Sequence, residues 1–397
     1  MREDLKKMMI ATVEKNLPEL KQIRNFLYEN PEVGGTEAKA SALLTKTLED
    51  HGFQVEREFH GIPYCFRSAF DSGKPGPVIG LTAEYDALPE IGHGCGHDII
   101  AAAPLGAAFA LKEAVMETGG SVVLYGTPAE ECFVSKAQLS REGAFDEADV
   151  AMTVHPNPVN QASGRTTALD AWQVDFYGKS AHAGAHPEEG VNALDAAVHF
   201  YTLIGFEKQY LKDTNIYGVF ADGGEKCSVI PDHAAVKYLV RADTVKDIAK
   251  IRAMFERCAG AAADAVGATY KIWNNEPGNM DMVTNETLSD VFDRYYEELG
   301  GGKMPKGESG GSTDMGDVSH VVPAIHPWIG LNCPQCSLHS REFAEVTVTE
   351  AGDRALELGA KALALTGLEV LTDPDLLKNI KMEFRQAEKA WKDETGE

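Results

Sequence analysis

The sequence predicts an α/β protein with a mostly parallel sheet, interrupted by a smaller inserted α+β domain. Three short apolar runs of the buried-strand type, at 77–81, 121–125 and 150–154, alternate with apolar stretches of helical spacing. From about 169 to 273 the order becomes strand, helix, strand, strand, helix, strand, which is typical of a ferredoxin-like unit. The chain has 397 residues, too many for one ordinary core, so we expect two domains.

The larger domain contains helices before and after the insertion. Apolar residues recur at helical spacing from residue 3, and Asn30-Pro31 stops that first helix. The same periodicity predicts helices, in chain order, at 3–29, 41–51, 99–116, 285–299 and 344–365. We therefore assign residues 1–167 and 279–397 to this domain.

The insertion, residues 168–278, mixes the two periodicities. Strand-like segments occur at 172–177 and 234–240, and helical stretches occur at 191–205 and 245–266. An antiparallel sheet with two helices is the arrangement that fits this order.

Charge and composition exclude several classes of partner. The net charge of −24 argues against nucleic acid and anionic membranes. The N-terminal residues 1–7 carry both signs of charge and lack the apolar core of a signal peptide. We find no apolar run approaching the roughly 20 residues that span a bilayer. We expect a cytoplasmic protein.

The seven cysteines do not form a disulfide framework, because they are scattered and odd in number. Cys333 and Cys336 have the CxxC spacing. A single such pair is a weak indication of zinc, and we interpret these two as loop cysteines.

The segment Gly92–Asp98 concentrates reactive side chains. Cys95 and His97 stand two residues apart, so on an extended segment they would face the same side. A thiolate and an imidazole suit Zn²⁺ or, with weaker preference, Mn²⁺. Taken alone, the segment is equally well explained as a glycine-rich turn with a buried cysteine.

Polar residues follow the ends of the three predicted strands. Open α/β sheets place their ligands at the carboxyl ends of the strands, so these side chains should converge. The residues concerned are Asp86, Cys95, His97, Glu130, Glu131 and His155.

Glu130 and Glu131 can divide two roles, because a hydrolytic metal site needs a carboxylate ligand and a separate general base. The alternative is a solvated acidic turn. His155, in a proline-stiffened loop, and His339 add two imidazoles. Together with Cys95, His97 and Glu131 they give five ligands. A single catalytic zinc normally keeps three and a water, so two metal ions fit better.

These residues carry a resemblance to a known family over nearly the whole chain. The sequence resembles the di-metal amidohydrolases and peptidases related to aminoacylase and carboxypeptidase G. Within that family it is similar to the branch of aminobenzoyl-glutamate hydrolase, the hippurate and indole-acetyl-amino-acid hydrolases, and the aminoacylase-1-like dipeptidases. The matching segments are 83–89, 92–98, 126–131, 155–156, 178–184, 229–232, 311–319 and His339.

The resemblance implies a metallopeptidase-like catalytic domain, an inserted dimerisation domain and a homodimer. It implies that Cys95 bridges two divalent ions, Mn²⁺ or Zn²⁺, and that Glu130 is the general base. Asp86 would orient a ligand or the water. The remaining ligands would be His97, Glu131, His155 and His339.

In the insertion, the resemblance implies that His182 holds the scissile carbonyl oxygen, reaching the site of the partner subunit. Arg241 is a candidate anchor for a substrate carboxylate, with a surface pairing to Asp243 as the alternative. Ser228 stands where the family usually has an asparagine that helps to hold substrate, so substrate specificity differs there.

Two departures from the family bear on the substrate. Ile99-Ile100 replaces the glycine and histidine of the hippurate and auxin-conjugate hydrolases, which favours the aminobenzoyl-glutamate and dipeptidase side. Residues 132–135 replace a run of glycines and reshape the pocket.

We therefore expect metal-dependent hydrolysis of an amide between an acyl or aminoacyl group and an amino acid or arylamine. Two alternatives stay open: an aromatic deaminase-type hydrolase on the same metal site, and a non-catalytic binding protein.

Overall fold

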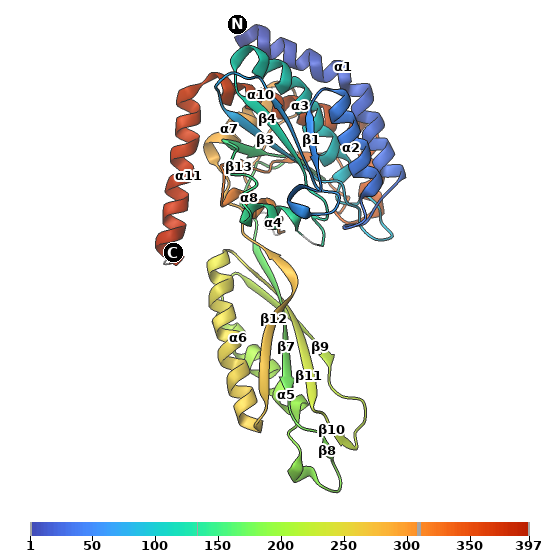
Figure 1. The fold of residues 1–397 in the computed structure, drawn as a ribbon, viewed down its shortest axis with the longest axis vertical. Coiled ribbons are helices and arrows are strands. Elements are labelled where there is room, and N and C mark those ends of the chain that lie inside the picture. The colour runs from blue at the N-terminus through green and yellow to red at the C-terminus, as the bar shows by residue number, and fades with distance from the viewer. Residues whose placement is uncertain (1, 133, 308–310, 396–397) are drawn as a thin grey trace. The chain divides into compact units, whose positions relative to one another are not determined.

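The computed structural model describes residues 2–132, 134–307 and 311–395, so Phe133 of the reshaped stretch lies outside the described residues. The chain divides into two compact units (Figure 1). Unit 1 comprises Met1–Arg165 and Met282–Glu397, and unit 2 comprises Thr166–Asp281. Each unit has its own buried hydrophobic core.

Unit 1 is built on a six-stranded sheet of order β1-β2-β4-β3-β5-β13. Strands β4, β3, β5 and β13 pair in parallel, whereas β1 and β2 add to the edge in antiparallel register. The predicted α/β fold with a mostly parallel sheet is confirmed. The strands are β1 Gln54–Arg57, β2 Phe66–Asp71, β3 Val78–Ala83, β4 Ser121–Gly126, β5 Val150–Met152 and β13 Ala324–Ile325, with a separate parallel pair, β6 His155–Asn157 and β14 Trp328–Gly330.

Helices surround this sheet (Figure 1). The alanine-rich α3 packs against both α1 and α10. The approach is close: a Cβ added at Gly106 of α3 would lie 2.6 Å from Leu20 Cδ1 and 3.0 Å from Ala360 Cβ. The helices of unit 1 are α1 Arg2–Glu29, α2 Ala38–Asp50, α3 His97–Thr118, α4 Ser135–Arg141, α7 Glu286–Glu298, α8 Met315–Ser319, α9 Arg341–Thr347, α10 Glu350–Thr372 and α11 Pro374–Thr395.

The prediction of one helix over 344–365 was wrong, because the chain forms α9 and α10 there. The Ser340 hydroxyl caps α9 by accepting from the Phe343 amide. At the other end, the buried Arg24 of α1 donates to the Thr347 carbonyl. That carbonyl therefore has a partner from a distant part of the chain, which local periodicity cannot reveal.

The prediction that no apolar run approaches membrane length was also wrong. Among the described residues, one helix, α3, is long and apolar enough, with 22 residues and a mean hydropathy of 1.6 in its best window. Of that window, 83% is buried inside the structure. A helix that is apolar on every side is typical of the core of a large protein as well as of a membrane span, and α3 has the core position.

Unit 2 is a four-stranded antiparallel sheet of order β12-β7-β11-β9 with two helices on one face. This confirms the predicted ferredoxin-like order. The main elements are β7 Ala168–Tyr177, α5 Ala193–Glu207, β9 Thr214–Asp222, β11 His233–Ala242, α6 Val245–Val266 and β12 Thr269–Asn279, with a small ribbon of β8 Ala181–His182 and β10 Val229–Ile230.

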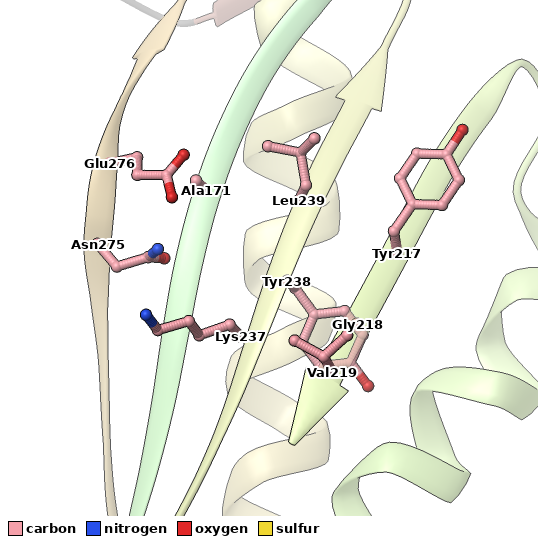
Figure 2. Close-up of a pocket in the computed structure, with 9 residues that line it drawn as sticks. All are labelled: Ala171, Tyr217, Gly218, Val219, Lys237, Tyr238, Leu239, Asn275 and Glu276. Carbon is pink, nitrogen blue, oxygen red and sulfur yellow. The ribbon is translucent and has the colours of Figure 1, made fainter. Parts of the chain in front are cut away.

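The other face of this sheet carries a shallow hollow of about 340 Å³. Figure 2 shows Lys237 reaching from β11 across β7 toward Asn275 of β12. Tyr217, Val219 and Leu239 also line the hollow, which contains none of the predicted metal ligands.

Candidate metal centre

Cys95 and His97 are brought together by a turn that runs into a helix. The extended conformation that we expected is not found: Cys95 lies in the turn and His97 is the first residue of α3. Gly96 between them has φ +81°, and a Cβ there would lie 2.3 Å from Pro156 Cγ. Only glycine fits this position, so the backbone of the turn comes close to the residue that follows His155.

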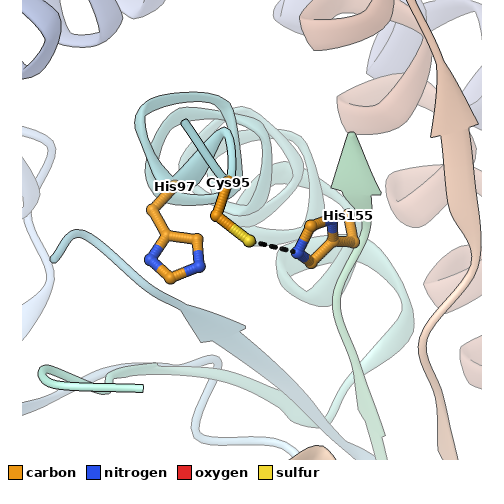
Figure 3. Close-up of side chains that lie close together, drawn as sticks. All are labelled: Cys95, His97 and His155. Atoms are coloured by element: carbon orange, nitrogen blue, oxygen red, sulfur yellow. Dashed lines mark hydrogen bonds between the residues drawn. The ribbon is translucent and has the colours of Figure 1, made fainter. Parts of the chain in front are cut away.

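Cys95, His97 and His155 form one group of buried candidate ligands, and Figure 3 shows Cys95 between the two rings. Cys95 Sγ lies 3.4 Å from His155 Nε2. His155 begins the short strand β6 rather than lying in the expected loop. Its Nδ1 donates to the Pro156 carbonyl, 2.7 Å away, which leaves the lone pair of Nε2 facing Cys95.

Two further groups share these residues: Cys95 with Glu131 and His339, and His97 with Glu130 and Glu131. Within each group the ligand atoms lie within 4.8 Å of one another. His339 Nε2 is 3.4 Å from Glu131 Oε1. The structure therefore gathers all five predicted ligands and Glu130, although they come from distant segments.

Asp86 is fully buried beneath the ligands. Its Oδ1 lies 2.9 Å from His97 Nδ1, and its backbone carbonyl lies 3.0 Å from the same nitrogen. Its Oδ2 accepts from the Glu131 amide at 3.0 Å. Both neighbours of His97 Nδ1 are acceptors, so that nitrogen carries the proton and Nε2 is free for a metal ion.

Two buried atoms of the candidate ligands, His97 Nε2 and Glu131 Oε1, have no hydrogen-bond partner among the described residues. Such atoms are rare in folded proteins because each costs desolvation free energy. A divalent ion would satisfy both. A thiol, imidazoles and carboxylates are the ligand types of zinc and related ions, so the residues fit a metal centre.

Burial and neighbouring charges shift the pKa values of several groups at the site. Burial, followed by the charges of Glu84, Asp314 and Glu131, raises the pKa of Glu130 well above its ordinary value. Burial also raises the pKa of the Cys95 thiol. Burial opposes ionisation of Glu131 as well, yet its contact with His339 and the charge of His97 lower its pKa. A bound cation would favour the thiolate and the carboxylates.

Sequence reasoning missed a buried charged cluster beside the ligands, formed by Glu84, Lys136 and Asp314. Lys136 Nζ lies 3.0 Å from Glu84 Oε1 and 2.5 Å from Asp314 Oδ1. None of the three is more than 1% exposed. Glu84 follows the same strand end as Asp86, and Asp314 lies in segment 311–319, which resembles the family. Both could therefore have been found from the sequence, whereas nothing in the sequence around Lys136 indicates a buried charge.

The structure places the other three predicted residues in unit 2. His182, in β8, accepts from the amides of Gly184 and Ala185 through Nδ1. Ser228 is exposed just before β10, and Arg241 lies near the end of β11. Their roles stay predictions.

Cys333 and Cys336, which we interpreted as loop cysteines, are joined in a disulfide. The pair stands in the loop that leads to His339.

The chain is similar to several known proteins. The profile of the peptidase dimerisation domain matches residues 167–266. The Xaa-Arg dipeptidase of Mus musculus is 33% identical, with 96% of this chain and 93% of the mouse protein covered. A component of the p-aminobenzoyl-glutamate hydrolase of Escherichia coli is 28% identical, with 92% of this chain and 91% of the bacterial protein covered.

Among solved structures, a dinuclear metal-binding peptidase of the M20 family from Bacillus subtilis has the same fold. Its TM-score is 0.66 at 20% identity, over 90% of this chain and 99% of that one. The similarity to the mouse dipeptidase extends over 96% of this chain. The chain therefore belongs to the M20 family of metal-dependent peptidases and amidohydrolases.

Proposed function

We propose that this protein is a two-metal dipeptidase whose preferred substrate ends in a basic residue. The observation that carries the proposal is the convergence of five ligands and one spare carboxylate, Glu130, around unpartnered buried ligand atoms. The 33% identity to an Xaa-Arg dipeptidase supports the substrate class.

Cys95 would bridge the two ions, because it is the residue shared by the group with His97 and His155 and the group with Glu131 and His339. His97 and His155 complete one group, and Glu131 and His339 complete the other. Mn²⁺ and Zn²⁺ are the candidate ions, and both accept this mixture of ligands.

Bound ions of this kind lower the pKa of a water molecule and polarise the substrate carbonyl. Glu130 accepts the proton from the attacking water and delivers it to the leaving amine, so one amide and one water give one acid and one amine. Asp86 holds His97 and the Glu131 backbone in place. His182 would stabilise the carbonyl oxygen, Arg241 would anchor the substrate carboxylate, and Ser228 would shape specificity.

We propose that the protein forms a homodimer through unit 2, for two reasons. The peptidase dimerisation profile covers most of it. Its edge strand β9 and the adjoining helix α5 expose large apolar side chains, among them Val198, Tyr201, Tyr217, Val219 and Phe220. Exposed apolar groups beside an unpaired strand edge are typical of an interface.

Charge favours a cationic substrate. The net charge of −24 attracts cations over long distances and raises their association rate at low salt. A dipeptide ending in arginine or lysine benefits from this attraction, whereas aminobenzoyl-glutamate is repelled.

The test begins with the metal content of the purified protein and continues with a substrate panel. The panel holds dipeptides ending in arginine or lysine, β-alanyl-lysine, aminobenzoyl-glutamate, hippurate and N-acetyl amino acids, each with added Mn²⁺ or Zn²⁺. We expect about two ions per chain, metal-dependent amine release and the highest kcat/KM on basic dipeptides, falling as salt rises. Ammonia release without amide cleavage would contradict the proposal and indicate a deaminase. If aminobenzoyl-glutamate were the best substrate, the enzyme would be a hydrolase of that conjugate rather than a dipeptidase for basic residues.

A further inference from the structure

The disulfide between Cys333 and Cys336 closes a very short loop, with a sequence separation of 3. The stabilisation that a disulfide gives by restricting the unfolded chain grows with the length of the loop it closes, so this bond contributes little to the stability of the whole fold. Unit 1 also has a large buried core and does not require such a staple. The effect of the bond is therefore local, on the segment that leads to His339.

Before the disulfide, this segment is attached to the chain that carries a candidate ligand. The Leu331 amide donates to the Asn157 carbonyl at 2.8 Å, and the Cys333 amide donates to the Pro158 carbonyl at 3.1 Å. Both carbonyls belong to the stretch that directly follows His155. One end of the loop is thus fixed to the buried side of the metal centre.

After the disulfide, the segment is attached beside Cys95. The His339 amide donates to the Gly94 carbonyl at 2.9 Å. His339 itself has φ +63°, in the left-handed region that residues with a side chain rarely adopt. Such a conformation persists only where the surrounding structure holds it. The disulfide, which ends three residues before His339, is the covalent part of that surrounding structure.

The two sulfur atoms differ in how well a reagent can reach them. Cys333 is 3% exposed, whereas Cys336 is partly exposed and follows the exposed Pro334 and Gln335. Access is one of the factors that decide which sulfur of a disulfide is attacked. Cys336 Sγ is therefore the point of attack, and Cys333 is the leaving group.

We propose that Cys333 and Cys336 are a site of reversible thiol–disulfide exchange with a dithiol reductant, and that their disulfide holds His339 at the metal centre. The effect on the metal rests on the proposed two-metal site. The exchange itself and the hold on the His339 backbone do not, so they are measured on the metal-free chain.

The exchange has two steps. A thiolate of the reductant attacks Cys336 Sγ, the S–S bond breaks, and its electron pair goes to Cys333 Sγ, which takes up a proton. The second thiolate of the reductant then attacks its own sulfur in the mixed disulfide and releases Cys336, which also takes up a proton. The protein gains two electrons and two protons, and the reductant becomes a disulfide.

Reduction frees the loop between its two attachments. His339 reaches Glu131 from an exposed position, with Nε2 3.4 Å from Oε1, so a looser backbone moves its ring away from that contact. Cys95, His97 and His155 are buried and lie outside the loop. We therefore expect reduction to weaken the binding of one ion and to leave the other almost unchanged.

The first experiment maps the thiols of the metal-free full chain. The protein is treated with glutathione disulfide, with dithiothreitol or with reduced thioredoxin, labelled with N-ethylmaleimide and analysed by mass spectrometry. We expect Cys333 and Cys336 to be unlabelled after oxidation and both labelled after either reductant. Labelling of both after oxidation, or of neither after reduction, would overturn the proposal.

Hydrogen exchange tests the hold on His339 in the same two samples. We expect the peptide that contains residues 331–340 to take up deuterium at least about threefold faster in the reduced chain, because local opening becomes easier. Equal exchange in the oxidised and reduced chains would show that the disulfide does not hold His339 and would overturn the proposal.

Calorimetric titration with Mn²⁺ and with Zn²⁺ then measures the effect on the metal, after the small reductant has been removed under nitrogen. We expect the affinity for one of two ions to be about tenfold lower in the reduced chain, and the other to change little. Two ions bound equally well in both forms would overturn the link to the metal centre. If neither form bound an ion, the two-metal site would fail, while the labelling and exchange results would still decide the rest.

Variants identify the thiols responsible. The double variant Cys333→Ser, Cys336→Ser should behave like the reduced natural protein in both buffers, because it cannot form the bond. Cys227→Ser is the matched control, since Cys227 is an exposed free cysteine of unit 2, and it should keep the full response to reduction. A response that persisted in the double variant would assign the effect to another thiol and contradict the proposal.

Discussion

Glu130 and Glu131 are neighbours with opposite electrostatic settings. Burial and the charges of Glu84 and Asp314 raise the pKa of Glu130 well above its ordinary value, whereas contacts with His339 and His97 outweigh burial and lower that of Glu131. Adjacent titratable groups whose pKa values are driven apart are typical of an acid–base group beside a ligand.

Glu130→Gln should therefore keep its metal and lose turnover. The amide fills the same space but cannot accept the water proton, so we expect kcat to fall at least about 10²-fold. Elemental analysis should still find the metal content of the natural protein. The companion variant Glu131→Gln should lose metal as well as turnover, and substantial activity in Glu130→Gln would remove Glu130 as the base.

Cys95→Ser should weaken metal binding, because a hydroxyl is a poorer ligand for a borderline-soft ion than a thiolate. We expect a loss of at least about tenfold in affinity for Zn²⁺, measured by calorimetry. Cys65→Ser is the control, since Cys65 is also a buried free thiol. Equal affinities in the natural protein and Cys95→Ser would show that the thiol is not a ligand.

Among single residues, the sequence indicates candidate ligands such as His155 and Glu131, because each directly follows a strand that can be recognised from neighbouring residues. It does not predict Lys136, whose partners Glu84 and Asp314 are distant in the chain and meet only in the folded protein. A lysine on a short helix is ordinarily a surface residue.

Among the elements, most of the long ones were predictable, whereas several of the short ones were not. The helix predicted at 245–266 is α6 with the same bounds, because its apolar stripe extends over several turns. Strands β6, β13 and β14 have two or three residues each, too few for any periodicity, and they form through parallel pairing with distant segments. At the break between α9 and α10, the Thr347 carbonyl accepts from the distant Arg24, a partner that the local sequence does not indicate.

Helix α7 contains a carboxyl group that makes stability depend on pH. Burial and then the charge of Asp290 raise the pKa of Asp293 to about 7 from an ordinary value of 3.8. The folded chain thus keeps this proton to higher pH than the unfolded chain does. The contribution of Asp293 to the free energy of unfolding therefore falls as the pH rises from about 4 to about 7.

Asp293→Asn should remove that fall. We expect a thermal midpoint a few degrees above that of the natural protein at pH 8 and nearly equal to it at pH 4, measured by calorimetry. Asp290→Asn, an exposed change on the same helix, should give a smaller gain. A variant without an advantage at pH 8 would contradict the assignment.

The whole molecule consists of two units with separate cores, and the matching dimerisation profile falls in unit 2. The change from helix–strand alternation to the ferredoxin-like order made the insertion visible in the sequence. The exposed apolar side chains of α5 and β9 were not visible in this way, because periodicity does not tell which face of an element remains uncovered.

The double variant Val198→Lys, Phe220→Lys should be monomeric. These exposed apolar residues lie on α5 and β9, and buried ammonium groups would oppose association there. Light scattering should show half the mass of the natural protein. Met116→Lys in unit 1, equally exposed, should stay dimeric. If the double variant remained dimeric, the dimer interface would not include Val198 and Phe220.

The two halves of the metal centre differ in how firmly the fold holds them. Cys95, His97 and His155 are buried, and His97 begins a helix that is packed into the core. His339 has a side chain 52% exposed to solvent and stands in an irregular segment with φ +63°. An ion in the buried half would leave only if the core moved, whereas one held by His339 would be open to water. Isotope exchange would therefore be biphasic, with one metal ion replaced quickly and the other slowly.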